Sequence, residues 1–247
     1  MKATESAAVS ATQEEAQPVV PAYAPEHAAI LREMIAAGVA TGRKKSSANP
    51  KMDGYVFTYA RGVAVMDIEQ TLALTDKAAA FLKTLMDEKR AILMLGSQAA
   101  ARDFVQTFAE KHGFMYIVNR WLGGTLTNFK TISQRIEYFK KLKADKASGA
   151  LDKYTKKENV VFDRTISNLT VSFSGMEEMT SLPAAIFVVD AGAHDIAIRE
   201  ARRMHIPIVA IMNNDNDPRG IEYPIPANDN SRSSLSWIFA RLEEKLR

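Results

Sequence analysis

Three short runs of this chain are almost entirely apolar, and each has the length of a single strand. They are AILMLG at residues 91–96, AAIFVVD at 184–190 and IPIVAIM at 206–212. A strand that is apolar on both faces belongs in a parallel sheet that helices cover on both sides. Segments with helical spacing, at residues 98–112 and 194–204, separate these runs. The sequence therefore predicts an α/β fold with a doubly wound parallel sheet.

The remaining elements continue this alternation. Residues 55–59 and 63–68 read as two short strands, and the intervening Ala60, Arg61 and Gly62 suit a hairpin. Helices are predicted at residues 26–38, 69–86 and 231–246, further strands at 114–118 and 221–225, and a polar, basic loop at 41–50.

A long insertion interrupts the alternation after residue 118. Residues 127–146 predict one helix, residues 148–153 a turn, and residues 155–179 a weaker second helix. Two antiparallel helices of that length form a coiled-coil-like arm of about 30 Å, at about 1.5 Å per residue. We therefore expect an α/β domain built from residues 28–118 and 183–247, with residues 119–182 inserted as a basic helical hairpin.

The N-terminal residues 1–27 differ in composition from the rest of the chain. They are rich in Ala, Glu, Gln, Val and Pro and have no periodic apolar face, which is typical of a disordered tail. They lack the basic start and apolar run of a signal peptide. No segment approaches the roughly 20 apolar residues that a membrane helix needs. The absence of cysteine excludes disulfides and thiolate metal sites, and we expect a cytoplasmic protein.

Positive charge is concentrated in the insertion. The whole chain carries 32 Lys and Arg against 29 Asp and Glu, and eleven basic groups against five acidic ones fall within residues 120–164. Lys140, Lys141 and Lys143, beside Tyr138 and Phe139, resemble a phosphate-binding face with stacking groups nearby. The alternative is a solvated helical face with ion pairs between successive turns. Because the basic hairpin is expected to project from the domain, we favour the interpretation that it binds RNA.

The run RWLGGTLTNFKTI at residues 120–132 combines a planar cation, an indole, two glycines and a helix start. Gly123 and Gly124 allow another backbone to come close. Thr125 or Thr127 is expected to cap the helix that follows. The alternative is a strand-to-helix turn with Trp121 plugged into the core.

Two other kinds of site compete with RNA binding. Asp190, Asp215 and Asp217 follow apparently parallel strands and could together hold Mg²⁺ for phosphoryl transfer. Gly96 and Ser97 form a turn whose backbone amides could hold a phosphate, although one glycine is far from a nucleotide-binding motif. The four histidines show no ligand-like spacing. We therefore expect no catalytic residues, no resident metal and no cofactor.

The run RWLGGTLTNFKTI resembles the signature of the bacterial-type small-subunit ribosomal protein S2 family. Further segments that look like this family, in the same order, are NPKM at 49–52, MDIEQTL at 66–72, LPAAIFVVD at 182–190, IAIREARRMHIPIVAI at 196–211 and DPRGIEYPIPAND at 217–229. The resemblance covers residues 28–246. Several motifs in the right order are more specific than any one of them.

This resemblance implies a flavodoxin-like (Rossmann-like) α/β domain with an inserted helical hairpin, and a structural role in place of catalysis. It implies a ribosome-bound protein on the solvent side of the small subunit, near the head–body junction, that supports subunit assembly and translation initiation. The implied partners are 16S-type small-subunit rRNA, neighbouring small-subunit proteins and the large mRNA-binding ribosomal protein S1. The expected rRNA-binding residues are Arg43, Lys44, Lys45, Arg120, Trp121, Asn128, Lys130, Arg135, Lys140, Lys141, Lys143 and Lys146.

Three loops depart from the family pattern. Ala40, Arg43 and Ala48 stand where the family usually has histidines and a tryptophan. Gln98 and Ala99 replace lysines after the Gly96 turn, and residues 191–193 read AGA in place of a proline with basic residues. These departures weaken the transfer of RNA contacts to the three loops and of the S1 contact. Arg43, Lys44 and Lys45 are the cations that could compensate.

Overall fold

The larger of two sheets is parallel and has five strands. The computed structural model describes residues 25–151 and 153–247, so the predicted tail at residues 1–24 lies outside the described part. The strands β4 (Ile92–Leu95), β5 (Met115–Ile117), β6 (Ala185–Val189), β7 (Ile208–Met212) and β8 (Tyr223–Pro226) pair in the order β5-β4-β6-β7-β8. Numbered along the chain from β4, this is the flavodoxin-like order 2-1-3-4-5. The predicted fold class is confirmed.

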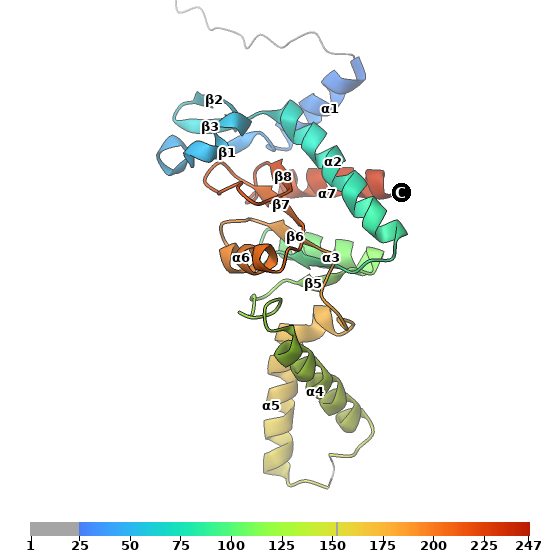
Figure 1. Cartoon of the computed structure of the whole chain (residues 1–247). Coiled ribbons are helices and arrows are strands. Elements are labelled where there is room, and N and C mark those ends of the chain that lie inside the picture. Colours follow the sequence, from blue (N-terminus) through green and yellow to red (C-terminus); the bar gives the residue numbers. More distant parts are fainter. Residues whose placement is uncertain (1–24, 152) are drawn as a thin grey trace, which may run out of the picture.

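Both faces of this sheet are buried, because successive side chains of a strand point to opposite faces. Phe187 of β6 faces one apolar cluster, and its neighbours Ile186 and Val188 face the other. The first cluster is covered by α1 (Pro25–Ala36), α2 (Ile68–Asp87), α3 (Arg102–His112) and α7 (Arg232–Leu246), and the second by α6 (Asp195–Arg203). Figure 1 shows these helices around the sheet. The apolar runs are therefore strands that two layers of helices enclose.

A small antiparallel sheet precedes the parallel one. Its strands β1 (Thr41–Lys44), β2 (Val56–Ala60) and β3 (Val63–Met66) pair in the order β1-β3-β2, which confirms the predicted hairpin. The prediction of a loop at residues 41–50 is wrong, because this segment contains β1, the short 3₁₀ helix Lys45–Ser47 and the first residue of a second one, Pro50–Tyr55. The sequence TGRK lacks strand patterning, and β1 forms because β3 offers it a partner.

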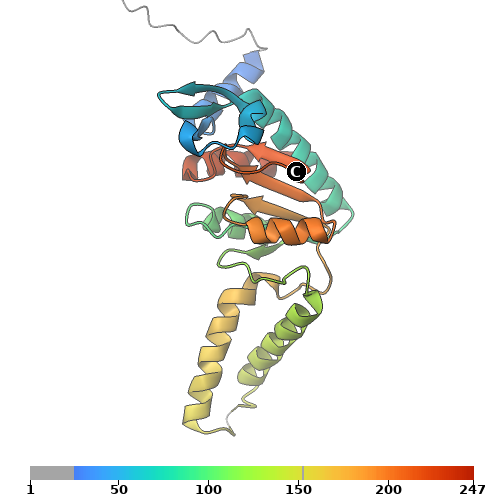
Figure 2. The same ribbon diagram turned by 60° about the vertical axis from the view of Figure 1, so that its left-hand side comes forward.

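The predicted helical arm is present between β5 and β6. It consists of α4 (Phe129–Ala147) and α5 (Lys156–Phe173), followed by the short 3₁₀ helix η3 (Ser174–Met176). Thr155 and Glu158 form a reciprocal capping box at the start of α5. Figures 1 and 2 show the arm projecting from the β5 side of the parallel sheet, at the opposite end from the small antiparallel sheet.

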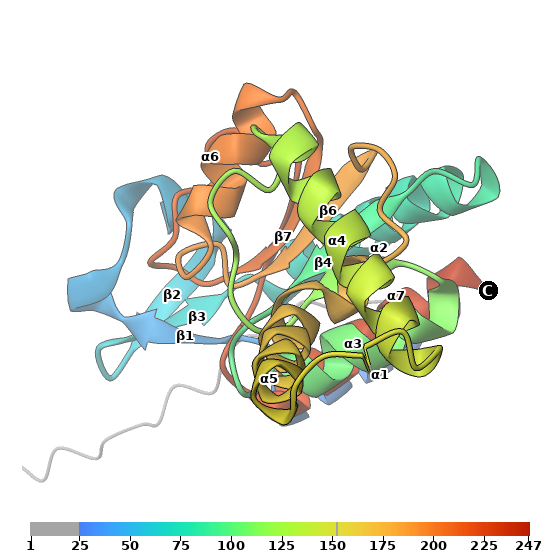
Figure 3. The same cartoon turned by 90° about the horizontal axis from the view of Figure 1, so that it is seen from below.

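The base of the arm belongs to the core of the α/β domain. Ile132, Ile136 and Phe139 of α4 and Phe173 of α5 are buried in the same apolar cluster as alternate residues of the parallel strands. Figure 3, seen from below, shows α4 and α5 in front of the sheet, with the start of α4 beside α6. The base of the arm is therefore packed into the core of the α/β domain and is not joined to it by a linker alone.

Several element boundaries differ from the predictions, and the largest difference is at the second arm helix, which ends at Phe173 and not at residue 179. The helix expected from residue 98 begins at Arg102, because the amides of Ala101 and Arg102 both donate to the carbonyl of Gln98 and make a turn first. The last parallel strand begins at Tyr223, two residues after its predicted start. The first helix begins at Pro25, so residues 25–27 of the predicted tail are helical.

Gly175 is the glycine with the closest neighbours at the end of the arm. A methyl group there would lie 2.2 Å from the Tyr116 carbonyl oxygen and within 2.8 Å of its ring. We expect Gly175→Ala to lower the free energy of unfolding by about 2 to 3 kcal/mol, since backbone must move to make room. Urea unfolding followed by circular dichroism measures this change.

The matched control for Gly175→Ala is Gly123→Ala. Gly123 has nothing within 4 Å of its ideal Cβ and no positive φ, so this change is expected to stay within about 0.5 kcal/mol of the wild type. Equal stability of the two variants would show that the contact between η3 and β5 is not needed for folding.

Candidate nucleic-acid interface

The arm loop, residues 120–128, wraps around a single carboxylate. Glu200 lies on α6, and its Oε1 accepts hydrogen bonds from Trp121 Nε1 at 3.0 Å and from the Gly124 amide at 2.8 Å. Its Oε2 accepts from the amides of Leu126 at 3.0 Å and Thr127 at 3.1 Å, and from Thr127 Oγ1 at 3.1 Å. Gly124 adopts a φ of 90°, which lets the loop turn around this carboxylate.

Glu200 carries a negative charge that the loop stabilises. Burial by itself would raise the pKa of Glu200, but hydrogen bonds from Trp121 and from the amides of Gly124, Thr127 and Leu126 outweigh it, so the pKa is lowered. Sequence reasoning missed this residue. It looks like any acid on a charged helix, and its partner Trp121 lies 79 positions away.

The predicted threonine cap of α4 is wrong. The residue before the helix is Asn128, and its side chain makes no capping hydrogen bond. Thr125 Oγ1 donates to the Leu122 carbonyl at 2.6 Å, and Thr127 is used by Glu200. Trp121 is half-buried and packs against the apolar cluster on the α6 face of the sheet. The core-plug alternative for Trp121 therefore describes much of its environment, and its role toward rRNA stays a prediction.

Three lysines of the predicted basic face hold the arm together. Lys143 Nζ lies 2.9 Å from Glu177, Lys140 Nζ lies 3.5 Å from Glu178, and Lys146 Nζ lies 2.7 Å from Asp163. Helical spacing explains this placement, because positions 140, 143 and 146 flank the buried seam toward α5. We call these three residues the paired lysines. They form ion pairs as the alternative expected, but their partners lie in other segments of the chain and not in the next helical turn.

Four other cations of the arm are exposed and unpaired in the described part of the chain. Arg120, Lys130, Arg135 and Lys141 are exposed and make no ion pair within residues 25–151 and 153–247. Lys130 and Lys141 are eleven positions apart, which is three helical turns, so they lie on one side of α4. We call these four residues the outer cations. They are among the charges that the arm leaves available to a partner, together with the exposed Lys153, Lys156, Lys157 and Arg164 of its far half, and Asn128 is exposed as well.

The three predicted cations of the first loop divide in the same way. Arg43 points inward, and its guanidinium lies 3.2 Å from Asp215, 3.5 Å from Asp229 and 3.8 Å from Asp190. Lys44 and Lys45 are exposed, and Lys45 Nζ lies 5.1 Å from the centre of the Tyr59 ring. Arg43 and Lys44 end β1 and Lys45 follows it, and β1 lies at the far end of the molecule from the arm (Figure 2). The predicted site is therefore two separate surfaces.

The carboxyl edge of the parallel sheet gathers buried acids, as predicted for Asp190 and Asp215. Burial and the negative charge of Asp190 raise the pKa of Asp229 to about 6, against the opposing effects of Asn213 and Arg43. Burial also raises the pKa of Asp215, which Arg43 opposes. Asp217 does not join them: Arg219 holds its pKa well below the usual value, and Lys51 lies 3.1 Å away.

This arrangement does not assemble the magnesium site that the three aspartates suggested. A guanidinium already lies between Asp190 and Asp215, and Asp217 is turned toward other cations. In the described part of the chain, no three His, Cys, Asp or Glu side chains are placed to hold one metal ion. Asp190 and Asp215 are therefore partners of Arg43 in an ion-pair network within the protein.

The phosphate site suggested at the Gly96 turn is also occupied by the protein itself. The Gly96 amide donates to the Ile117 carbonyl at 3.1 Å, and the Ser97 amide donates to His194 Nε2 at 3.3 Å. A Cβ at Gly96 would lie 2.7 Å from Val105 Cγ2. The glycine therefore serves the close packing of α3 on β4, which was the alternative at this turn.

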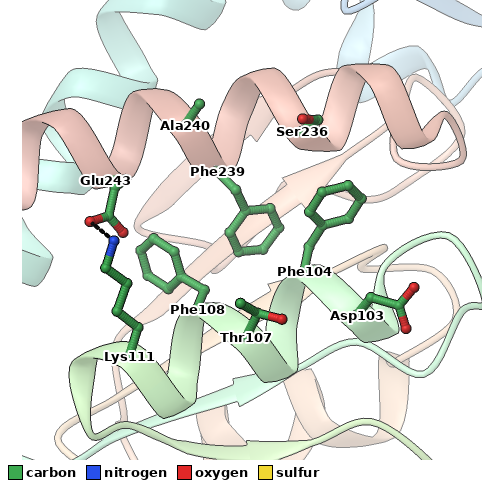
Figure 4. Close-up of a pocket in the computed structure, with 9 residues that line it drawn as sticks. All are labelled: Asp103, Phe104, Thr107, Phe108, Lys111, Ser236, Phe239, Ala240 and Glu243. Carbon is green, nitrogen blue, oxygen red and sulfur yellow. Dashed lines mark ion pairs between the residues drawn. The ribbon is translucent and has the colours of Figure 1, made fainter.

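An apolar groove that was not predicted from the sequence lies between α3 and α7. Figure 4 shows Phe104, Phe108 and Phe239 lining it, with Lys111 paired to Glu243 at one end. The Phe108 and Phe239 rings meet edge-on with their centroids 5.3 Å apart. It lacks the convergent polar groups of a small-molecule site.

An α/β protein with a protruding cationic arm is the class that this fold and interface define. The chain matches the family model described as Ribosomal protein S2 over residues 34–246. It belongs to that family, whose members are structural constituents of the small ribosomal subunit and associate with rRNA and other ribosomal proteins. This is a family of structural ribosomal proteins and not an enzyme family. Among the described residues, no helix is both long and apolar enough to span a membrane.

Proposed function

We propose that this chain binds 16S-type small-subunit rRNA through the outer cations of its arm, near the head–body junction, and thereby supports subunit assembly and translation initiation. The observation that carries the proposal is the division of the arm's cations. The paired lysines each have a carboxylate partner within the protein, whereas Arg120, Lys130, Arg135 and Lys141 are exposed without one among the described residues.

The chemistry of such a surface suits phosphate. Cations that neutralise phosphates release condensed counterions, so binding weakens as salt is raised. Contacts to phosphate and sugar fix the position of a protein on RNA without reading its sequence. Asn128 and Trp121 border the same surface and add a hydrogen-bonding group and part of an aromatic face. Lys44 and Lys45 form a second, smaller contact that we assign to the other end of the molecule.

The proposal extends to protein partners and location. We infer a cytoplasmic, ribosome-bound protein that touches neighbouring small-subunit proteins, with ribosomal protein S1 among the candidates. The inward position of Arg43 leaves only Lys44 and Lys45 of the substituted loop as surface cations. A contact with S1 therefore needs its own test, such as crosslinking of assembled subunits.

Sedimentation of a lysate through a sucrose gradient tests the proposal. We expect this chain to comigrate with small-subunit rRNA at close to equal stoichiometry, because a structural constituent is present once per particle. Each fraction is probed for the chain and for the rRNA. A peak confined to free soluble protein would contradict the proposal.

A further inference from the structure

The arm is held to the α/β domain at both ends, but by different means. At its end, Gly175 packs against the Tyr116 carbonyl, and Asn119 Nδ2 donates to the Val171 carbonyl at 2.8 Å. At its start, the polar contact is the set of five hydrogen bonds that Glu200 accepts from the arm loop. Glu200 is buried, with 8% of its surface exposed. The start of the arm is therefore fixed by a charge that water hardly reaches.

The hydrogen bonds of Glu200 lie at the start of the arm, where a small change in the angle of α4 moves the far end of the helix by a larger distance. The Leu126 and Thr127 amides that it holds come directly before α4, which begins at Phe129. A helix of 19 residues is about 28 Å long. A tilt of about 10° at its start moves its far end by about 5 Å, which is the rise of one helical turn. The displacement grows along α4, so among the outer cations it is largest at Lys141, about 18 Å from the start of the helix, where it is about 3 Å.

We propose that Glu200 is a positioning residue that fixes the direction of the arm before rRNA is bound. The inference rests on the proposed function, because it assigns to Glu200 the pre-orientation of the outer cations. A surface that is already oriented loses less conformational freedom on binding. Glu200 touches no ligand itself and acts only through residues 121–127.

The substitution Glu200→Gln tests this role with little change in shape. An amide offers one acceptor oxygen, and its nitrogen faces N–H groups that it cannot accept from, so part of the set is lost. Glu137→Gln is the matched control, since it removes one negative charge from the exposed side of α4, where no partner is seen within the described ranges. Both variants alter net charge equally, but only Glu200→Gln removes hydrogen bonds from the arm loop.

Because the chain has no cysteine, two introduced cysteines carry spin labels cleanly. We place them at Asp87, at the end of α2, and Ala147, at the far end of α4, both exposed. Pulsed electron resonance then gives the distribution of distances between the arm and the α/β domain. We expect Glu200→Gln to broaden this distribution and Glu137→Gln to leave it as in the wild type.

The second readout is binding to purified small-subunit rRNA over a range of salt. We expect Glu200→Gln to raise Kd about tenfold, equal to about 1.4 kcal/mol, with an unchanged salt slope, because every cation is still present. Glu137→Gln is expected to bind at least as tightly as the wild type. A changed slope for Glu200→Gln, or equal Kd values for the two variants, would overturn the proposal.

A third variant covers the case in which Glu200→Gln fails to fold, as judged by its circular dichroism. Thr127→Val removes only the hydroxyl donor to Oε2 and keeps the shape of the side chain. It is expected to broaden the distance distribution by a smaller amount, and an unchanged distribution would overturn the inference. If the wild type binds no rRNA at all, the proposed function fails, while the distance measurement still decides the role of Glu200.

Discussion

Replacing Lys130, Arg135 and Lys141 together with glutamine is expected to weaken binding of small-subunit rRNA by about 100-fold near 0.1 M salt. Each of these side chains is exposed on α4 without an ion pair in the described part of the chain. If all three meet phosphates, the slope of log affinity against log salt falls by about 2 to 3. Filter binding of purified rRNA at several salt concentrations measures both quantities.

The paired lysines provide a control with the same number of charges on the same helix. Replacing Lys140, Lys143 and Lys146 with glutamine removes charges that Glu177, Glu178 and Asp163 already neutralise. We expect a small change in the salt slope, although net charge changes as much as in the first variant. Equal slopes in the two triple variants would mean that α4 acts through its total charge and not through an oriented surface.

The second large effect is expected for Arg43→Met. Its guanidinium lies against the carboxylates of Asp190, Asp215 and Asp229, of which Asp229 is fully buried. Removing one partner of a buried ion pair leaves the other charge uncompensated. Because Arg43 itself is partly exposed, we expect a loss of about 2 to 3 kcal/mol in the free energy of unfolding near pH 7.5. Urea unfolding at several pH values measures it.

The pH dependence of this loss has a defined sign. The pKa of Asp229 is raised to about 6 in the folded protein, above its usual 3.8, so the folded state binds this proton more tightly. Stability therefore decreases as pH rises through that window and stays lower above it. Loss of Arg43 raises the pKa of Asp229 further, so the deficit of the variant is small near pH 4 and grows as the pH rises through this raised pKa.

Lys44→Met is the control for Arg43→Met. Lys44 is the next residue of β1, is exposed and makes no ion pair with the described residues. Its replacement is expected to change stability by less than about 0.5 kcal/mol at every pH. An Arg43→Met deficit that does not vary with pH would contradict the account of the carboxylates.

The fold was largely predictable because its signals are local. A strand such as residues 184–190 is apolar on both faces whatever its partners are, and the helical spacing of the arm lies within each helix. β1 escaped prediction because TGRK carries no such pattern and is a strand only beside β3. The start of α3 was misplaced because a turn at residues 98–101 imitates helical spacing.

The interface was predictable in composition but not in arrangement. The basic character of the arm is plain from its sequence, whereas the division into paired lysines and outer cations depends on Glu177 and Asp163 across the hairpin. From the sequence, Arg43 was placed among the surface cations, because its partner Asp229 lies 186 positions away in the sequence. Glu200 could not be recognised for the same reason. Long-range electrostatic partners have no periodic signature in a single sequence.

The place of the arm between β5 and β6 also bears on how the chain reaches its fold. β4 pairs with β6, so the centre of the sheet closes only after α3, β5 and the whole insertion have been made. A hairpin of two local helices forms early and brings its own ends together. It thereby shortens the effective loop about twofold, which lowers the entropic cost of closure by about 0.6 kcal/mol. Pulsed hydrogen exchange during refolding should then find α4 and α5 protected before β6. The helical arm would therefore also speed the pairing of β4 with β6 in the parallel sheet.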